Sequence, residues 1–262
     1  MKRMRFNFLC GIIMSVCCLA TLELYAQNQK KEFYEIKVYH LKNKSQEDRV
    51  DEYLKNLFIP AMHKAGIKNV GVFKPIATDT AFGKRIYVLT AYSSPERFVE
   101  VSDGLVSNLS SEKSEYLDAA YTDAPYQRIE SILLRAFPLM LQMETPKITS
   151  ARGDRIYELR SYESATESIY RSKVRMFNDG DEVGLFKRLG FNAVFYADVI
   201  SGSRMPNLMY MTTFVNRTAR DEKWKLFVED PHWKRLVSMP EYQHNISKMS
   251  IYLLTPTEYS DY

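Results

Sequence analysis

The alternation of hydrophobic and polar positions predicts eight β-strands in this chain of 262 residues. Two of these stretches are near copies of each other. Residues 32–39 read Glu-Phe-Tyr-Glu-Ile-Lys-Val-Tyr, and residues 155–162 read Arg-Ile-Tyr-Glu-Leu-Arg-Ser-Tyr. Alternation rich in β-branched and aromatic residues is typical of strands. The predicted strands cover residues 33–40, 69–75, 84–92, 127–136, 156–162, 191–199, 208–215 and 246–254.

Between these strands, apolar residues recur at helical spacing. In the first half, Ser45 is predicted to cap a helix, and Ser94-Pro95 predicts the start of a second. The Ser-rich run 102–114 predicts an insertion or a break in that second helix. In the second half, helices are predicted over residues 167–189, 220–228 and 233–238.

Each half therefore shows the order βαββαβ, which predicts a tandem duplication. This order is the ferredoxin-like unit, an antiparallel sheet with both helices on one face. The other face must also be covered, and two halves can cover each other sheet against sheet. We predict an α+β fold in which tandem ferredoxin-like repeats form a pseudo-twofold dimeric α/β-barrel. The expected halves are residues 32–138 and 155–256, joined by a linker over 139–154.

The N-terminus has the pattern of a secretory signal peptide. Lys2, Arg3 and Arg5 precede an apolar run over residues 6–20, and Ala26 offers a small residue for cleavage. The run is shorter than the roughly 20 apolar residues that a membrane-spanning helix needs. We predict a signal peptide over residues 1–26 and export to the periplasm or the extracellular space, with no stable membrane span.

All three cysteines, Cys10, Cys17 and Cys18, lie in this leader. The processed chain would then have no disulfide, no thiolate metal site and no cysteine nucleophile. Cys10 follows Leu9 and Cys17 follows Val16, not small residues, which argues against lipoprotein anchoring.

Charge and motifs exclude further classes. The leader holds three basic residues and one acidic residue, so its removal lowers the formal charge from +4 to +2. That balance indicates no basic surface for nucleic acid. The chain also contains no nucleophile elbow, dinucleotide-binding fingerprint or P-loop. The sequence therefore assigns no catalytic residue and predicts no metal site.

The opening strands carry the candidate ligand-binding residues. With a period of two, one face of the first carries Glu35, Lys37 and Tyr39, and one face of the second carries Glu158, Arg160 and Tyr162. We expect the apolar faces to meet the helices and these polar faces to point into the space between the sheets. Lys37 and Arg160 could then hold an anionic group of a small ligand. The alternative is structural ion pairs with packing tyrosines, which duplication alone would preserve.

Two histidines are further candidates for ligand binding. His63 lies near the end of the first helix, and His232 lies in the run Asp-Pro-His-Trp. Neither has a second metal ligand at helical spacing, so a surface or capping role is favoured. His40 and His244 are interpreted as strand-edge residues. Trp224 and Trp233 are predicted to pack against the sheet.

Residues 156–162 resemble the opening strand of NIPSNAP domains. Residues 219–234 resemble that family's second helix with its Asp-Pro-x-Trp signature, whereas residues 33–137 lack the signature. The resemblance implies the dimeric α/β-barrel fold, a group that also includes small monooxygenases and haem-degrading enzymes. It implies no catalytic residues. In the haem-binding relatives a helix-borne histidine is the axial ligand, so haem stays open for His63 or His232, although no cofactor is predicted.

Three hypotheses for function remain at this point. The first is an exported protein that binds a small ligand or a partner at the cavity between its sheets. The second is a cofactor-independent oxygenase or isomerase of the dimeric α/β-barrel type, and the third is an assembly protein. An enzyme should show an acid or base beside a cavity. The sequence does not decide whether the protein is an enzyme or an oligomer.

Overall fold

The computed structural model describes residues 30–262, and the predicted signal peptide lies outside them. All eight predicted strands are confirmed, with ends within two residues of the expected positions. They are β1 (Phe33–His40), β2 (Val70–Pro75), β3 (Arg85–Tyr92), β4 (Arg128–Ala136), β5 (Ile156–Glu163), β6 (Asn192–Ser201), β7 (Asn207–Phe214) and β8 (Lys248–Pro256).

In the described part of the chain, these strands close into an antiparallel barrel in the order β1-β3-β2-β8-β5-β7-β6-β4. The first four strands run β4-β1-β3-β2 and the last four run β8-β5-β7-β6, so both halves have the same ferredoxin-like order. Three residue pairs join β2 to β8, and four join β4 to β6. The predicted fold class is confirmed.

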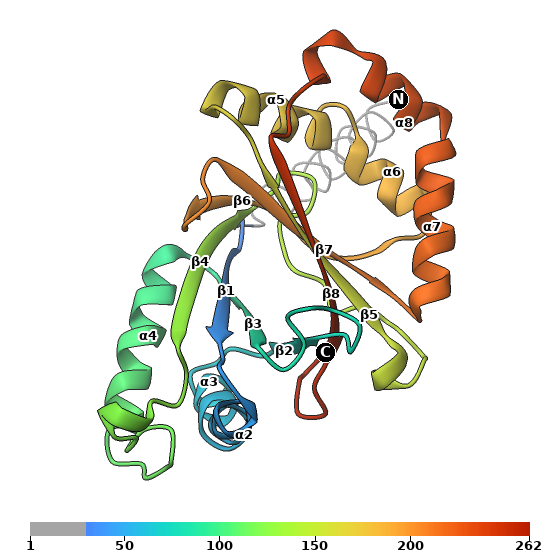
Figure 1. The fold of residues 1–262 in the computed structure, drawn as a ribbon. Coiled ribbons are helices and arrows are strands. Elements are labelled where there is room, and N and C mark those ends of the chain that lie inside the picture. Colours follow the sequence, from blue (N-terminus) through green and yellow to red (C-terminus); the bar gives the residue numbers. More distant parts are fainter. Residues whose placement is uncertain (1–29) are drawn as a thin grey trace, which may run out of the picture. The chain divides into compact units, whose positions relative to one another are not determined.

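Helices cover the barrel in two groups on opposite sides (Figure 1). The first group is a continuous helical segment, α2 (Lys44–Tyr53), the π-turn η1 (Leu54–Phe58) and α3 (Ile59–Lys64), together with α4 (Pro95–Leu109). The second group is α5 (Glu167–Asn178), α6 (Glu182–Arg188), α7 (Arg217–Glu229) and α8 (Pro231–Ser238). No helix between residues 30 and 262 is long and apolar enough to cross a membrane.

One helix prediction was wrong, and the predicted break in the Ser-rich run is confirmed only at Leu109, where α4 ends. The N-cap of α2 is Asn43, not Ser45, because Asn43 is extended and its Oδ1 accepts a hydrogen bond from the Gln46 N–H at 3.0 Å. Helix α4 also continues through the first part of the Ser-rich run. Ser102 and Ser107 donate their hydroxyls to carbonyls four residues back, so these serines satisfy themselves within the helix and do not end it.

Most of the strands are buried on both faces, whereas β4 and β8 are exposed or half-buried over much of their length. One apolar cluster fills the barrel with residues from both halves, including Ile36, Leu89, Leu159 and Met211. Two further clusters lie between the sheet and each group of helices. In β5 every residue from Ile156 to Tyr162 is buried.

The two ends of the barrel differ. Aromatic rings fill one end. Phe73 packs on Tyr157 with centroids 4.8 Å apart and on Tyr262 at 5.8 Å, and Tyr34 packs on Phe195 at 5.3 Å. The other end, where β1 finishes at His40, retains a cavity. Among the described residues, this end holds the cavity that reaches the barrel interior.

Candidate functional site

The candidate residues of the opening strands point away from the barrel, opposite to the prediction. Tyr39 and Tyr162 belong to the clusters beneath the helices, whereas Ile36 and Val38 face the barrel interior. The physical reason is that a closed barrel needs apolar side chains from all its strands. The polar side chains therefore lie on the outer face of the strands, where the helices supply hydrogen-bond donors to them. Alternation identified the two faces correctly but assigned each to the wrong layer.

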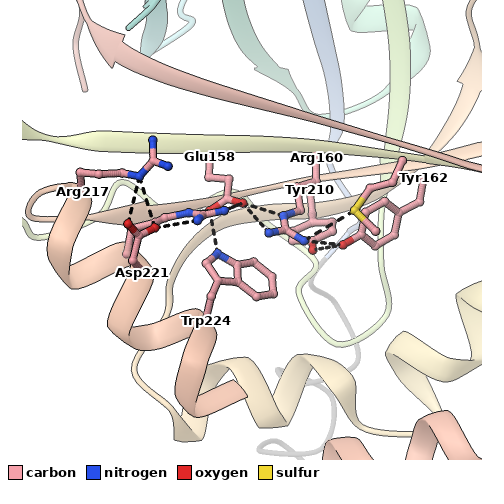
Figure 2. A network of polar contacts seen from close by, with 9 residues as sticks. Glu158, Arg160, Tyr162, Tyr210, Arg217, Asp221 and Trp224 are labelled. Atoms are coloured by element: carbon pink, nitrogen blue, oxygen red, sulfur yellow. Dashed lines mark hydrogen bonds and ion pairs between the residues drawn. The ribbon is translucent and has the colours of Figure 1, made fainter. Parts of the chain in front are cut away.

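In the second half, Glu158 lies at the centre of a buried polar network between β5 and α7 (Figure 2). Arg160 on the same strand donates its Nε to Glu158 Oε1 at 2.7 Å. From α7, Arg220 donates Nε to Oε2 and Nη2 to Oε1, both at 2.8 Å. Trp224 donates its Nε1–H to Oε2 at 2.7 Å. Both oxygens of this carboxylate are therefore saturated with donors.

Arg160 extends the network further along the strand. Its guanidinium lies 3.5 Å from the centroid of the Trp224 ring, and its Nη1 donates to the Tyr162 hydroxyl at 2.9 Å. The Tyr162 and Tyr210 hydroxyls are 2.7 Å apart. Burial alone would raise the pKa of Glu158, but the hydrogen bonds and charges of Arg220 and Arg160 outweigh it and lower that pKa. A ligand could reach Glu158 only by displacing one of these donors.

The equivalent row of the first half has fewer partners. Glu35 Oε1 accepts from the Ser131 hydroxyl at 2.7 Å and lies 3.6 Å from Lys37 Nζ. Tyr39 packs edge-on against Tyr116 and Tyr126. The structure thus brings Glu35 to Lys37, and Glu158 to Arg160 and Tyr162. The two sets lie beneath different helices and do not share one cavity.

The candidate histidines lie away from both rows and bind other groups. His63 Nε2 is 2.9 Å from Asp261 Oδ2 near the end of α3. His232 lies in the first turn of α8, where its Nε2 is 2.8 Å from the Gly180 carbonyl oxygen and its Nδ1 contacts Arg235. Among residues 30–262, no group of three or more His, Cys, Asp or Glu is placed to hold a metal ion.

The cavity at the open end of the barrel, here called the barrel mouth, is the candidate functional site. Its floor is apolar and consists of Ile36, Val38, Tyr87, Leu159, Val199 and Met209. Its rim is polar and consists of His40, Arg85, Glu130, Ser161, Arg204 and Asn207. The cavity volume is about 40 Å³, which is room for about three water molecules. Residues of both halves form it, so one half alone could not.

The rim carries charges of both signs. His40 Nε2 is 3.5 Å from Glu130 Oε2, and Ser203 donates its hydroxyl to the other oxygen of Glu130. Arg204 donates to the Tyr252 hydroxyl at 3.1 Å. Arg85 forms no ion pair with any residue that the structure describes. Burial raises the pKa of Tyr87 to about 12 despite the lowering effect of nearby Arg85, so this phenol stays protonated at neutral pH.

Sequence reasoning missed this rim. His40 was interpreted as a strand-edge residue, yet it continues the period-two row of Ile36 and Val38 that faces the barrel interior. Arg85 is its cross-strand partner on β3. Strand pairing could have indicated both, once the direction of that row was known. Arg204 comes from the β6–β7 connection, and no linear pattern indicates its position.

Comparisons with known proteins agree with this architecture. The NIPSNAP family model matches residues 157–261. A search of curated proteins finds no match. The chain is similar in structure to a candidate monooxygenase from Lactobacillus acidophilus NCFM, with 12% identity over 87% of this chain and 94% of that chain and a TM-score of 0.54.

Two more solved structures show the same likeness. A candidate monooxygenase from Fusobacterium nucleatum is 11% identical over 87% of this chain and 93% of that chain, with a TM-score of 0.51. An anthrone oxidase-like protein is 9% identical over 87% of this chain and 92% of that chain, also with a TM-score of 0.51. At such low identities the likeness establishes the fold alone.

Proposed function

From the geometry of the site we propose that this chain, whose second half is a NIPSNAP domain, binds a small molecule at the barrel mouth. The fold of that domain does not by itself indicate a reaction. One observation carries this proposal. An apolar-floored cavity lies at the open end of the barrel, and charged and polar side chains from both halves converge on its rim. Binding sites for small molecules commonly combine an apolar lining with a few convergent polar groups.

The cavity also limits the chemistry of the ligand. A volume of about 40 Å³ admits only a short apolar group. The rest of the ligand must then lie at the rim, where Arg85 offers a guanidinium that no described acid neutralises. Guanidinium groups bind carboxylates through paired hydrogen bonds. The best-supported ligand class is therefore a short-chain carboxylate or a similar small anion.

Calorimetric titration with acetate, propanoate, butanoate and hexanoate tests this proposal. Affinity is expected to rise about fourfold per added methylene and to stop rising once the cavity is full. Arg85→Gln is expected to weaken binding about tenfold because a charge-assisted hydrogen bond is lost. The matched control is Arg175→Gln, which removes an exposed arginine on α5. Equal binding by wild type and Arg85→Gln would overturn the proposal.

A cofactor-independent oxygenase or isomerase is the second candidate. The observation that favours it is the His40–Glu130 pair beside the cavity, because a positioned histidine can accept a proton from a bound substrate. The likeness to candidate monooxygenases supports the same direction. Oxygen uptake with anthrone as the probe tests the oxygenase reaction. Uptake that His40→Ala does not lower would remove this role for His40.

We also propose that the protein is exported, on the basis of the leader pattern in residues 1–26. Mass spectrometry of the protein recovered from the periplasm or the medium should find Gln27 as the first residue. Recovery only as the full-length chain from the cytoplasm would contradict export.

A further inference from the structure

The two halves of the protein can be compared position by position where each third strand leads into a helix. Helix α4 begins at the N-cap Ser94 and helix α7 at the N-cap Asn216, and each cap lies two residues after its strand. Eight residues after the cap, the second half has Trp224 and the first half has Ser102. The largest side chain of the second network therefore has a small counterpart in the first half.

Trp224 makes two contacts with polar residues of β5. Its Nε1–H donates to Glu158 Oε2 at 2.7 Å, and its ring lies 3.5 Å from the Arg160 guanidinium carbon. The corresponding strand residues of the first half are Glu35 and Lys37. The same pair of groups, an acceptor and a cation, is thus present there without the indole.

Ser102 does not take over these contacts. Its hydroxyl donates to the Phe98 carbonyl of its own helix at 2.7 Å. Glu35 is 4% exposed, and among the residues that the structure describes its Oε2 has only the Tyr92 hydroxyl, at the long distance of 3.4 Å. Lys37 Nζ has Glu35 at 3.6 Å and otherwise lies 5.3 Å from the Phe58 ring centroid. A buried carboxylate oxygen with one weak donor is costly unless another donor reaches it.

Beside Ser102 lies a groove of about 500 Å³, formed by the sheet, α4, the end of α2 with η1, and the turn that follows α4. Its lining includes Glu35, Lys37 and Ser102 together with Phe58, Tyr92 and Leu105, and the turn after α4 adds the carboxylates of Glu112 and Asp118. This volume lies within the usual range for small-molecule sites. Aromatic and aliphatic walls favour a flat apolar body, and Glu35 favours an N–H donor on it.

From this comparison we propose that the groove binds a planar aromatic molecule carrying a ring N–H, such as an indole, in the place that Trp224 occupies in the other half. The N–H donates to Glu35 Oε2, and the ring faces the Lys37 ammonium. This site is separate from the barrel mouth, since the groove lies between sheet and helix while the mouth lies inside the barrel. The inference does not depend on the function proposed above.

Titration of the full protein with indole and with indene, its isostere without the N–H, tests the proposal. Ligand-observed NMR or calorimetry is suitable because the tryptophans of the protein would obscure a fluorescence signal. Indole is expected to bind about tenfold more tightly than indene, since indene cannot donate to a charged acceptor. Equal binding of the two ligands, or no binding of indole at millimolar concentration, would overturn the proposal.

Two variants locate the bound indole. Ser102→Trp should fill the groove with a covalent indole and abolish indole binding while the protein stays folded. The matched control is Val99→Trp, because Val99 is 54% exposed on the same helix, and it should bind indole as wild type does. If Ser102→Trp folds and still binds indole like wild type, the ligand lies elsewhere and the proposal fails. Should Ser102→Trp unfold, Glu35→Met serves instead, and it must remove the preference for indole over indene.

Discussion

At the scale of single residues, Glu158 is the polar group on which the second half depends most. The Glu158→Gln variant would leave the buried Arg160 and the partly buried Arg220 without their shared counter-charge. Breaking a buried ion pair by removing one partner is strongly destabilising, and we expect a loss of about 3 kcal/mol in the free energy of unfolding. Urea denaturation at pH 7 measures it.

The matched control for that change is Glu35→Gln, the same substitution in the first half. Glu35 has one short hydrogen bond, from Ser131, and a longer contact to Lys37. A loss of about 1 kcal/mol is expected. If the two variants lose the same free energy of unfolding, the larger number of hydrogen bonds in the second network does not contribute to stability.

The pH dependence of Glu158 follows from the direction of its pKa shift. Its folded-state pKa is lowered from the ordinary 4.5 because Arg220 and Arg160 outweigh the opposing effect of burial. The carboxylate therefore contributes fully to stability above about pH 4.5, and this contribution is lost as pH falls through the lower folded pKa. The urea midpoints of wild type and Glu158→Gln should converge over the acid range below about pH 4.5. A constant difference over that range would contradict the assignment.

At the scale of an element, the start of α2 distinguishes the observed N-cap from the one that the sequence suggested. Asn43→Ala removes the acceptor for the Gln46 N–H and should lower the free energy of unfolding by about 1 kcal/mol. Ser45→Ala changes an exposed residue within the first turn and should leave it nearly unchanged. Thermal or urea denaturation of the two variants decides between the caps. A larger loss of stability for Ser45→Ala than for Asn43→Ala would identify Ser45 as the N-cap.

The sequence predicted the strands well because alternation and β-rich composition are local properties, as in Phe33–His40. It could not predict which face of a strand such as β5 turns inward, because both faces of that strand are buried. In β5, Leu159 packs inside the barrel while its neighbours Glu158 and Arg160 are buried beneath α7. The alternation pattern indicates that polar residues such as these face solvent or a cavity. They are buried under a helix instead, because enough hydrogen-bond donors surround the carboxylate to satisfy it there.

The candidate site was harder to predict for the same reason. The rim of the barrel mouth combines His40, Arg85, Glu130 and Arg204 from four separate segments. Strand pairing relates the first three, but only after the inward row is known. The sequence predicts that Trp224 packs against the sheet, but it could not predict the hydrogen bond from Trp224 to Glu158. That hydrogen bond depends on the angle at which α7 crosses the sheet.

At the scale of the whole barrel, the β2–β8 seam between the halves has the fewest paired residues. Only three residue pairs join β2 to β8, and two of them include Pro75 or Pro256, which have no N–H to donate. Eight pairs join β1 to β4. In hydrogen–deuterium exchange, peptides covering residues 70–76 should exchange faster than peptides covering 33–40. Equal protection would show that the seam opens only with the whole barrel.

Such thin seams are sufficient because both halves belong to one chain. The connecting residues 137–155 also hold to the barrel, with the Glu32 N–H donating to the Leu141 carbonyl and the Glu144 N–H to the Val194 carbonyl, both at 2.9 Å. A tethered partner is present at an effective concentration in the millimolar range, whatever the dilution of the protein. The unfolding midpoint should therefore stay constant over about a hundredfold dilution, whereas a barrel of two separate chains would lose stability. Because the two halves are covalently connected, the seam residues do not have to supply the binding free energy that would hold two separate chains together.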